Sequence, residues 1–281
     1  MNNSVNLESY NDVENLSRFT EDTFKAYCDL KLETCKDDMQ FIINHCYNGR
    51  KMNVCEIGSG NSKLLYALDL EGYINTADDY EVSESRYKFA EKFKEYLFGE
   101  KKCNCNNINA NILEIKTDKK YDVIIGVDMV LQFIAPLYDN AEKDFFEWVL
   151  AHINDNGYLF LELEDLDGVV SCIHSNGIEK SWEEFPEGDV FQYGLYKLSC
   201  DKKDNIIGEK IFLERKTMKK QFFVIVTKSY SKNRIFDLLS KYGFTCEFYS
   251  YYSEDDETPI NERKKLYRVL AKRNMSHLIS N

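Results

Sequence analysis

The sequence is poor in proline and has no long apolar run. Only three of its 281 residues are proline, at Pro136, Pro186 and Pro259. No proline-rich linker therefore divides the chain, and we expect it to be compact throughout. No apolar stretch approaches the ~20 residues needed to cross a bilayer. Residues 1–7 lack the basic and apolar regions of a signal peptide. We therefore expect a cytoplasmic protein with no membrane partner.

An excess of positive charge and a disulfide framework are also missing. The formal net charge is −12, and nucleic-acid binding needs a basic surface, so we expect no nucleic-acid partner. The nine cysteines are scattered and odd in number, which fits reduced thiols better than paired ones. Cys103 and Cys105 are spaced too closely for the usual zinc knuckle and no second pair accompanies them. We expect no metal site.

A glycine turn near residue 58 organises the chain. Val54 and Ile57 are the apolar part of a predicted buried strand, and residues 62–70 have a helical pattern. Between them, Gly58 and Gly60 let the backbone adopt positive φ and approach a ligand closely. The free N–H groups and the positive end of the helix dipole face the same space. This segment predicts a strand, a ligand-binding turn and a helix.

The rest of the chain alternates predicted strands and helices. An amphipathic pattern over residues 20–45 predicts one long helix or two helices before the first strand. Five strand–helix units up to residue 164 then predict a doubly wound α/β domain with a parallel sheet. Three strand-like runs between residues 189 and 228 have no helix between them, which predicts an antiparallel insert. A helix at 231–241 and strands at 244–251 and 265–271 complete the pattern.

These patterns divide the chain into four parts. We expect an N-terminal helical arm or lid (1–50), a Rossmann-like core (51–175), an antiparallel insert over the acceptor pocket (176–228), and a C-terminal helix with the last two core strands (229–281).

Polar side chains follow successive strands at the distances that a nucleoside ligand needs. Glu81 comes one helix and one strand after Glu56, where a carboxylate can accept hydrogen bonds from ribose hydroxyls. Asn111 follows the third predicted strand and could meet an adenine edge. Val127 and Asp128 follow the fourth and would line the floor of the site.

With these residues the sequence resembles the class I S-adenosylmethionine-dependent methyltransferases. The segment Glu56-Ile57-Gly58-Ser59-Gly60 is similar to the family's E/D-x-G-x-G motif, and Glu81 matches its acidic ribose-binding position. Asn111 stands where the family often has Asp, which keeps hydrogen bonding to adenine but weakens the match. The resemblance covers about residues 50–165, and more loosely 222–273. It implies a seven-stranded sheet whose last strand, 266–271, pairs antiparallel at the sheet edge.

The resemblance also implies the cofactor, S-adenosyl-L-methionine, and the residues that bind it. They are Glu56, Ile57, Gly58, Ser59, Gly60, Glu81, Asn111, Ile112, Val127 and Asp128. A dinucleotide-binding turn would carry a third glycine, where this chain has Lys63, so an NAD-dependent oxidoreductase is less favoured. A protein that binds the cofactor without catalysis, or a partner subunit, stays open as the alternative.

The expected reaction is in-line methyl transfer to an oxygen or nitrogen of a small molecule. An alcohol acceptor needs a base during attack, and an amine loses its proton afterwards. The candidate bases are Asp128, Glu162, Glu164, Asp165 and His174, of which His174 is favoured. Asp128 could instead be a structural turn residue or contact the cofactor. At least one of Glu162 and Glu164 could be exposed to solvent or paired with another side chain near the end of the strand. We expect Phe133, Trp182 and Phe185 to bind the acceptor, although packing of the insert explains the last two equally well.

Three methyltransferase subclasses lack support in the sequence. The chain reads Asp128-Met129-Val130-Leu131 where enzymes acting on amino groups of DNA bases carry N/D-P-P-Y/F. No cysteine follows a proline, as cytosine C5 chemistry would require, and Asp139-Asn140 precedes the fifth strand, unlike the pair of metal-dependent catechol-type enzymes. The Asn-, Lys- and Tyr-rich composition suggests a bacterial source and, as acceptor, a surface carbohydrate or its nucleotide-linked precursor. A homodimer is compatible with the sequence, which does not fix the assembly.

Overall fold

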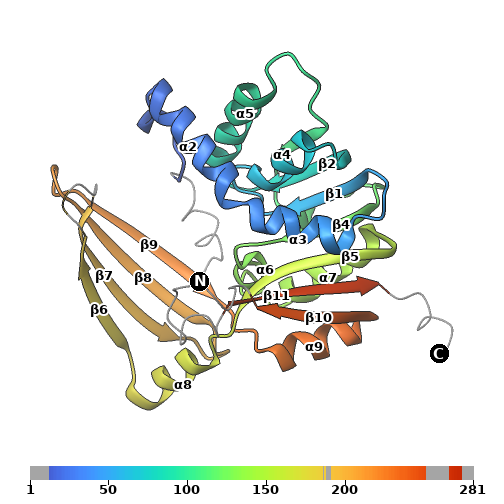
Figure 1. Cartoon of the computed structure of the whole chain (residues 1–281). Coiled ribbons are helices and arrows are strands. Elements are labelled where there is room, and N and C mark those ends of the chain that lie inside the picture. Colours follow the sequence, from blue (N-terminus) through green and yellow to red (C-terminus); the bar gives the residue numbers. More distant parts are fainter. Residues whose placement is uncertain (1–12, 186, 188–190, 251–265, 274–281) are drawn as a thin grey trace.

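The computed structural model describes residues 13–185, 187, 191–250 and 266–273 (Figure 1). Its elements in chain order are η1 (Leu16–Arg18), α2 (Glu21–Thr34), α3 (Lys36–Cys46), β1 (Met52–Ile57), α4 (Lys63–Leu70), β2 (Ile74–Glu81), α5 (Glu84–Phe98), β3 (Cys105–Asn109), η2 (Ile112–Glu114), β4 (Tyr121–Gly126), α6 (Val130–Ile134), α7 (Ala141–His152), β5 (Ile153–Glu164), α8 (Asp167–Asn176), β6 (Glu179–Glu184), β7 (Phe191–Cys200), β8 (Ile206–Glu214), β9 (Lys220–Thr227), α9 (Lys232–Lys241), β10 (Phe244–Ser250) and β11 (Leu266–Arg273).

Seven strands form the main sheet, in the order β10-β11-β5-β4-β1-β2-β3. The pairs β2–β3, β1–β2, β1–β4 and β4–β5 are parallel, and β11 runs antiparallel to both β5 and β10. The carboxyl ends of the parallel strands therefore meet at one edge, with the strand order changing direction between β1 and β4. In such sheets ligands bind at that switch point.

Helices cover both faces of this sheet, because its central strands are apolar on both sides. In β4, Val123 and Ile125 belong to one buried cluster with α2, α3, α4 and α5. The residue between them, Ile124, belongs to a second cluster with α6, α7 and α9. Figure 1 shows the two groups of helices on opposite sides of the sheet. The predicted doubly wound, Rossmann-like α/β fold is confirmed.

The last strand of the main sheet is not where the resemblance implied. Its antiparallel pairing is confirmed, since Leu266 pairs with Glu164 and Lys272 with Tyr158. The predicted edge position is wrong, because β11 lies between β5 and β10, and β10 forms the edge. Val269 and Ala271 are fully buried there, which an inner position explains.

A separate four-stranded antiparallel sheet, β6-β7-β8-β9, follows the fifth strand of the core. It projects away from the seven-stranded sheet in Figure 1, with α8 leading into it and α6 packed against β9. The predicted antiparallel insert is confirmed, but it has four strands where the sequence indicated three. The additional strand is β6, whose sequence Glu-Lys-Ser-Trp-Glu-Glu has one apolar residue.

The N-terminal arm consists of two helices that pack on α4. Thr20 caps α2 through a reciprocal pair of hydrogen bonds with Thr23, and a break at Cys35 separates α2 from α3. Of the two predicted alternatives, two helices are confirmed. Across the described ranges, the structure contains no helix with the length and apolar character needed to cross a membrane.

Candidate functional site

The glycine turn lies between β1 and α4, and its backbone adopts the left-handed conformation that glycine favours. The φ angles are +66° at Gly58 and +63° at Gly60. The N–H of Gly58 donates to Tyr80 O on β2 at 2.8 Å, which joins the turn to the neighbouring strand. A Cβ at Gly58 would lie 2.5 Å from Val130 Cγ2, and one at Gly60 would lie 2.4 Å from Arg86 Nη2. The positive φ therefore disfavours other residues at both positions, and at Gly58 the side chain of Val130 would also have to shift.

The carboxylate of Glu81 is held against this turn. Its Oε2 accepts the N–H of Gly60 at 2.8 Å and its Oε1 accepts the N–H of Ser83 at 2.7 Å. The guanidinium of Arg86 lies 4.0 Å away, and its Nε also donates to Glu14 Oε2 at 3.2 Å. Burial raises the pKa of Glu81, while Arg86 opposes that shift. The acidic side chain that the sequence indicated is thus fixed at the end of β2.

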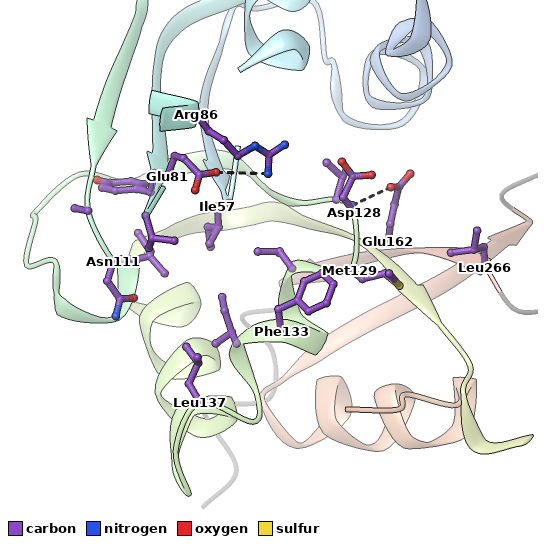
Figure 2. A pocket seen from close by; sticks show the side chains of 18 residues that line it. Ile57, Glu81, Arg86, Asn111, Asp128, Met129, Phe133, Leu137, Glu162 and Leu266 are labelled. Carbon is purple, nitrogen blue, oxygen red and sulfur yellow. Dashed lines mark hydrogen bonds and ion pairs between the residues drawn. The ribbon is translucent and has the colours of Figure 1, made fainter. Parts of the chain in front are cut away.

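A cavity of about 470 Å³ opens beside this turn (Figure 2). Its volume falls in the range of about 300–1,000 Å³ that is typical of small-molecule sites. The lining residues come from the carboxyl ends of β1, β2, β4 and β5, from α5 and α6, and from the start of β11. They are Ile57, Gly58, Tyr80, Glu81, Val82, Arg86, Ala110, Asn111, Ile112, Val127, Asp128, Met129, Val130, Phe133, Ile134, Leu137, Glu162 and Leu266.

The chain after β4 enters the cavity in a strained conformation. Asp128 and Met129 have φ angles of +53° and +60°, which are uncommon for residues other than glycine and occur often at functional sites. The turn directs the N–H of Asp128 to Glu162 Oε2 on β5 at 3.2 Å. Two carboxylates thus face the cavity side by side, as Figure 2 shows.

Glu162 is also part of a buried ionic network. Its Oε1 accepts Arg268 Nε of β11 at 3.3 Å, and the same guanidinium pairs with Asp38 of α3. Burial, together with the carboxylate of Asp38, raises the pKa of Glu162 from 4.5 to about 8. Glu162 therefore changes its charge near neutral pH while it faces the cavity.

The segment before α2 reaches the glycine turn through Glu14. Its carboxylate accepts hydrogen bonds from Asn61 Nδ2 at 2.6 Å and from Tyr27 Oη at 2.9 Å, besides Arg86 Nε. Ser85 Oγ donates to Val13 O at 2.7 Å. The N-terminal arm is thus joined to the edge of the site. Its predicted action as a lid stays a prediction.

The structure brings most of the predicted binding residues together. Those that line the cavity are Ile57, Gly58, Glu81, Asn111, Ile112, Val127, Asp128 and Phe133. Glu56, Ser59 and Gly60 belong to the same strand and turn. The amide of Asn111 has partners already, since Oδ1 accepts Leu113 N at 3.2 Å and Nδ2 donates to Glu114 at 3.1 Å.

Five predicted residues lie elsewhere. Asp165 is outside the cavity, and its Oδ1 accepts the N–H of Asp167 at 3.0 Å. His174 is on α8, with Nε2 2.8 Å from Asp204 Oδ1 and its side chain 57% exposed. Glu164 lies past the cavity, where its main chain exchanges hydrogen bonds with Gln132. Trp182 is 66% exposed on β6, and Phe185 packs on Phe212 inside the insert. Helix α8 and the insert hold His174, Trp182 and Phe185 away from the cavity, and Glu164 and Asp165 follow Glu162, the last residue of β5 that lines it. The proposed catalytic and acceptor roles of these residues therefore lose geometric support.

Sequence reasoning missed Arg86, Met129 and Leu266. Arg86 had a local signal, because it is the third residue of a helix that begins directly after the acidic strand end. The only sequence signal for Met129 was its position directly after Asp128. Leu266 had no sequence signal, because it lines the cavity only as a result of the pairing of β11 with β5.

Proteins similar to this chain are found by structure and not by sequence. No family model and no curated protein matches the sequence. Solved structures do match: the CcbJ methyltransferase from Streptomyces caelestis has a TM-score of 0.64 and 13% identity, covering 84% of this chain and 94% of that one. An S-adenosylmethionine-dependent methyltransferase from Clostridium acetobutylicum has a TM-score of 0.61 and 13% identity, covering 94% and 96%.

A third similar structure is CalS10, an amino pentose methyltransferase from Micromonospora echinaspora. Its TM-score is 0.59 at 9% identity, and the match covers 91% of this chain and 98% of that one. The chain therefore has the fold of the class I S-adenosylmethionine-dependent methyltransferases.

Proposed function

We propose that this chain is an S-adenosyl-L-methionine-dependent methyltransferase that acts on a small polar molecule. One observation carries the proposal: the cavity lies at the switch point of the sheet, against the glycine turn, with the Glu81 carboxylate fixed at its edge. That placement suits a ligand with a ribose next to the turn.

The residues present fit this cofactor. Glu81 would accept hydrogen bonds from the ribose hydroxyls, and the apolar side chains of Ile112, Ile134 and Leu137 would cover the adenine. Two buried polar atoms of the motif, Glu56 Oε2 and Ser59 Oγ, have no hydrogen-bond partner among the described residues. Such atoms are costly unless a partner is supplied, and a ligand with an amino and a carboxylate group could supply one.

The acceptor end of the cavity favours an amine. Asp128 and Glu162 face it together, and their carboxyl oxygens would accept hydrogen bonds from an amino group. In its ionised form, which a pKa of about 8 makes accessible near neutral pH, Glu162 would take the proton from the ammonium group. When bound, the cofactor supplies an electrophilic methyl group. Asp128 and Glu162 would hold the acceptor nitrogen in line with that methyl group, and such positioning would account for much of the rate.

The acceptor class that we propose is a small amino-bearing carbohydrate, free or nucleotide-linked, of bacterial origin. It rests on the carboxylate pair, and the fold of the amino pentose methyltransferase described above is compatible with it. The net charge of −12 argues against nucleic acid as acceptor. The nine free cysteines agree with the expected cytoplasmic location, because thiols stay reduced there.

A homodimer is the assembly that we propose. Four apolar side chains form one row across the insert, since Trp182 pairs with Leu195, Leu195 with Ile211, and Ile211 with Phe222. Trp182, Leu195 and Phe222 are at least half exposed. Exposed apolar patches of this kind often mark protein interfaces.

The cofactor site is tested by placing one large side chain at two glycines. Gly58→Arg should abolish binding of S-adenosylhomocysteine in calorimetry, because the side chain enters the cavity. Gly49→Arg is the matched control: Gly49 also has positive φ, +90°, but nothing lies within 4 Å of its Cβ position. It should bind like the wild type. Retained affinity in folded Gly58→Arg protein would contradict the site assignment.

A further inference from the structure

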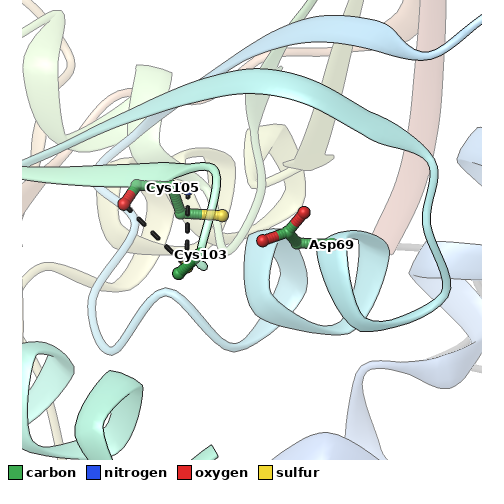
Figure 3. A group of neighbouring side chains, drawn as sticks. All are labelled: Asp69, Cys103 and Cys105. Carbon is green, nitrogen blue, oxygen red and sulfur yellow. Dashed lines mark hydrogen bonds between the residues drawn. The ribbon is translucent and has the colours of Figure 1, made fainter. Parts of the chain in front are cut away.

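Three potential metal ligands meet on the side of the sheet opposite the cavity. Asp69 lies near the end of α4, while Cys103 and Cys105 lie at the start of β3 (Figure 3). Their ligand atoms all lie within 4.8 Å of one another. Because β3 runs parallel to β1 and β2, its first residue is at the amino edge of the sheet, away from the glycine turn. The cluster takes no part in the proposed methyl transfer.

The spacing of these atoms suits a tetrahedral zinc ion. Zinc lies about 2.3 Å from thiolate sulfur and about 2.0–2.2 Å from carboxylate oxygen. Two ligands in a tetrahedral shell are then about 3.5–3.8 Å apart. Ligand atoms within 4.8 Å of one another would have to draw together by up to about 1 Å to reach these values. Asp69 is the ligand that the sequence could not reveal, since it lies more than thirty residues earlier in the chain.

Hydrogen bonds hold Asp69 and Cys103 in place, while the Cys105 thiol donates to Leu65 O at 3.6 Å, a bond that metal binding would replace. Asn104, between the cysteines, donates its main-chain N–H to Asp69 Oδ2 at 2.8 Å and its amide to Oδ1 at 2.7 Å. The N–H of Cys105 donates to Cys103 Sγ at 3.4 Å. Outer hydrogen bonds of this kind orient the ligands in metal sites. Asp69 and the cysteine loop thus form one preorganised unit.

The charge balance is also favourable. Two thiolates and one carboxylate would carry three negative charges, of which a divalent cation offsets two. Lys94 is close by, with Nζ donating to Cys105 O at 2.7 Å, and offsets the third. Asp69 and Cys105 are buried and Cys103 is partly exposed, so an ion would enter from the Cys103 side.

We propose that Asp69, Cys103 and Cys105 bind one zinc ion, with water as the fourth ligand. Binding replaces the two thiol protons, which are released to solvent. The ion would join the end of α4 to β3, the strand at the edge of the main sheet. The ion would take no part in methyl transfer, because the ligands are remote from the cavity.

Cobalt(II) titration of the reduced, full-length protein tests this site, because cobalt–thiolate bonds absorb visibly and in the near ultraviolet. We expect one Co²⁺ per chain, displaced by Zn²⁺. Cys103→Ser and Cys105→Ser should lose the thiolate absorption, and Asp69→Ala should weaken binding at least ~10-fold. Cys200→Ser, a partly exposed thiol in the insert, is the matched control and should bind like the wild type.

Two results would overturn the proposal. One is folded, reduced wild-type protein that shows no thiolate absorption with Co²⁺. The other is a signal that persists in both Cys103→Ser and Cys105→Ser. Circular dichroism of each variant separates lost binding from lost folding, and mass spectrometry would reveal a Cys103–Cys105 disulfide as the competing state. Neither result bears on cofactor binding at the opposite edge.

Discussion

Glu162 combines burial, ionic contacts and access to the cavity in a single side chain. It is 3% exposed, it accepts hydrogen bonds from Asp128 N and Arg268 Nε, and its pKa is raised to about 8. The folded protein therefore keeps a proton on this group between about pH 4.5 and 8, where the unfolded chain has released it. Stability from this group is greatest at low pH and is lost as the pH rises through that window.

Replacing Glu162 by Gln should make stability less dependent on pH. The amide resembles the protonated acid and does not titrate, so the slope contributed by this group, up to about 1.4 kcal/mol per pH unit, disappears. Urea unfolding of both proteins at several values between pH 5 and 8.5 measures it. Parallel stability profiles for the variant and the wild type would show that Glu162 does not carry the shifted pKa.

The same position shows what residue-level reasoning could and could not predict. Glu81 and Gly58 were found because strand ends and glycine turns have fixed sequence spacing. The expectation that His174 is the base, rather than Glu162, has no geometric support. The sequence does not give the path of the chain after a strand ends. Helix α8 takes His174 to the exposed surface beside Asp204. Glu162, two residues before the end of a twelve-residue strand, faces the cavity.

At the scale of elements, the insert was predicted in type but not in full. Strand β7 is rich in aromatic and other apolar residues, and β8 and β9 are rich in β-branched residues, so all three have a recognisable strand pattern. Strand β6 is mostly charged and exposed, because it is the edge of a sheet that projects from the core. Its pairing with β7 defines it, and pairing between strands is not a local property of the sequence.

The apolar row on this sheet leads to a prediction about assembly. Trp182→Lys should shift the protein from dimer to monomer, because it places a charge in the row that Leu195, Ile211 and Phe222 continue. Ser181→Lys is the matched control, since Ser181 is the neighbouring exposed residue on the opposite face of the strand. Analytical ultracentrifugation measures both. A wild-type protein that stays monomeric at tens of micromolar, or a dimer unaffected by Trp182→Lys, would argue against this interface.

For the whole molecule, the layered architecture could be predicted and the strand order at one side could not. Apolar runs such as β4 indicate a sheet buried on both faces, and its residues indeed divide between two clusters. The insertion of β11 between β5 and β10 depends on which edge the chain reaches after α9. That insertion also brings Arg268 to Glu162 and Leu266 to the cavity, so a global feature completes the local site.

The central claim is that the cavity binds S-adenosylmethionine, and titration calorimetry of the wild-type protein tests it most directly. S-adenosylmethionine, S-adenosylhomocysteine and NAD would be titrated in parallel. We predict micromolar binding of both sulfur nucleosides, about 8 kcal/mol, and no heat from NAD, because Lys63 stands where a dinucleotide turn has its third glycine. Binding of NAD without either sulfur nucleoside would contradict the account.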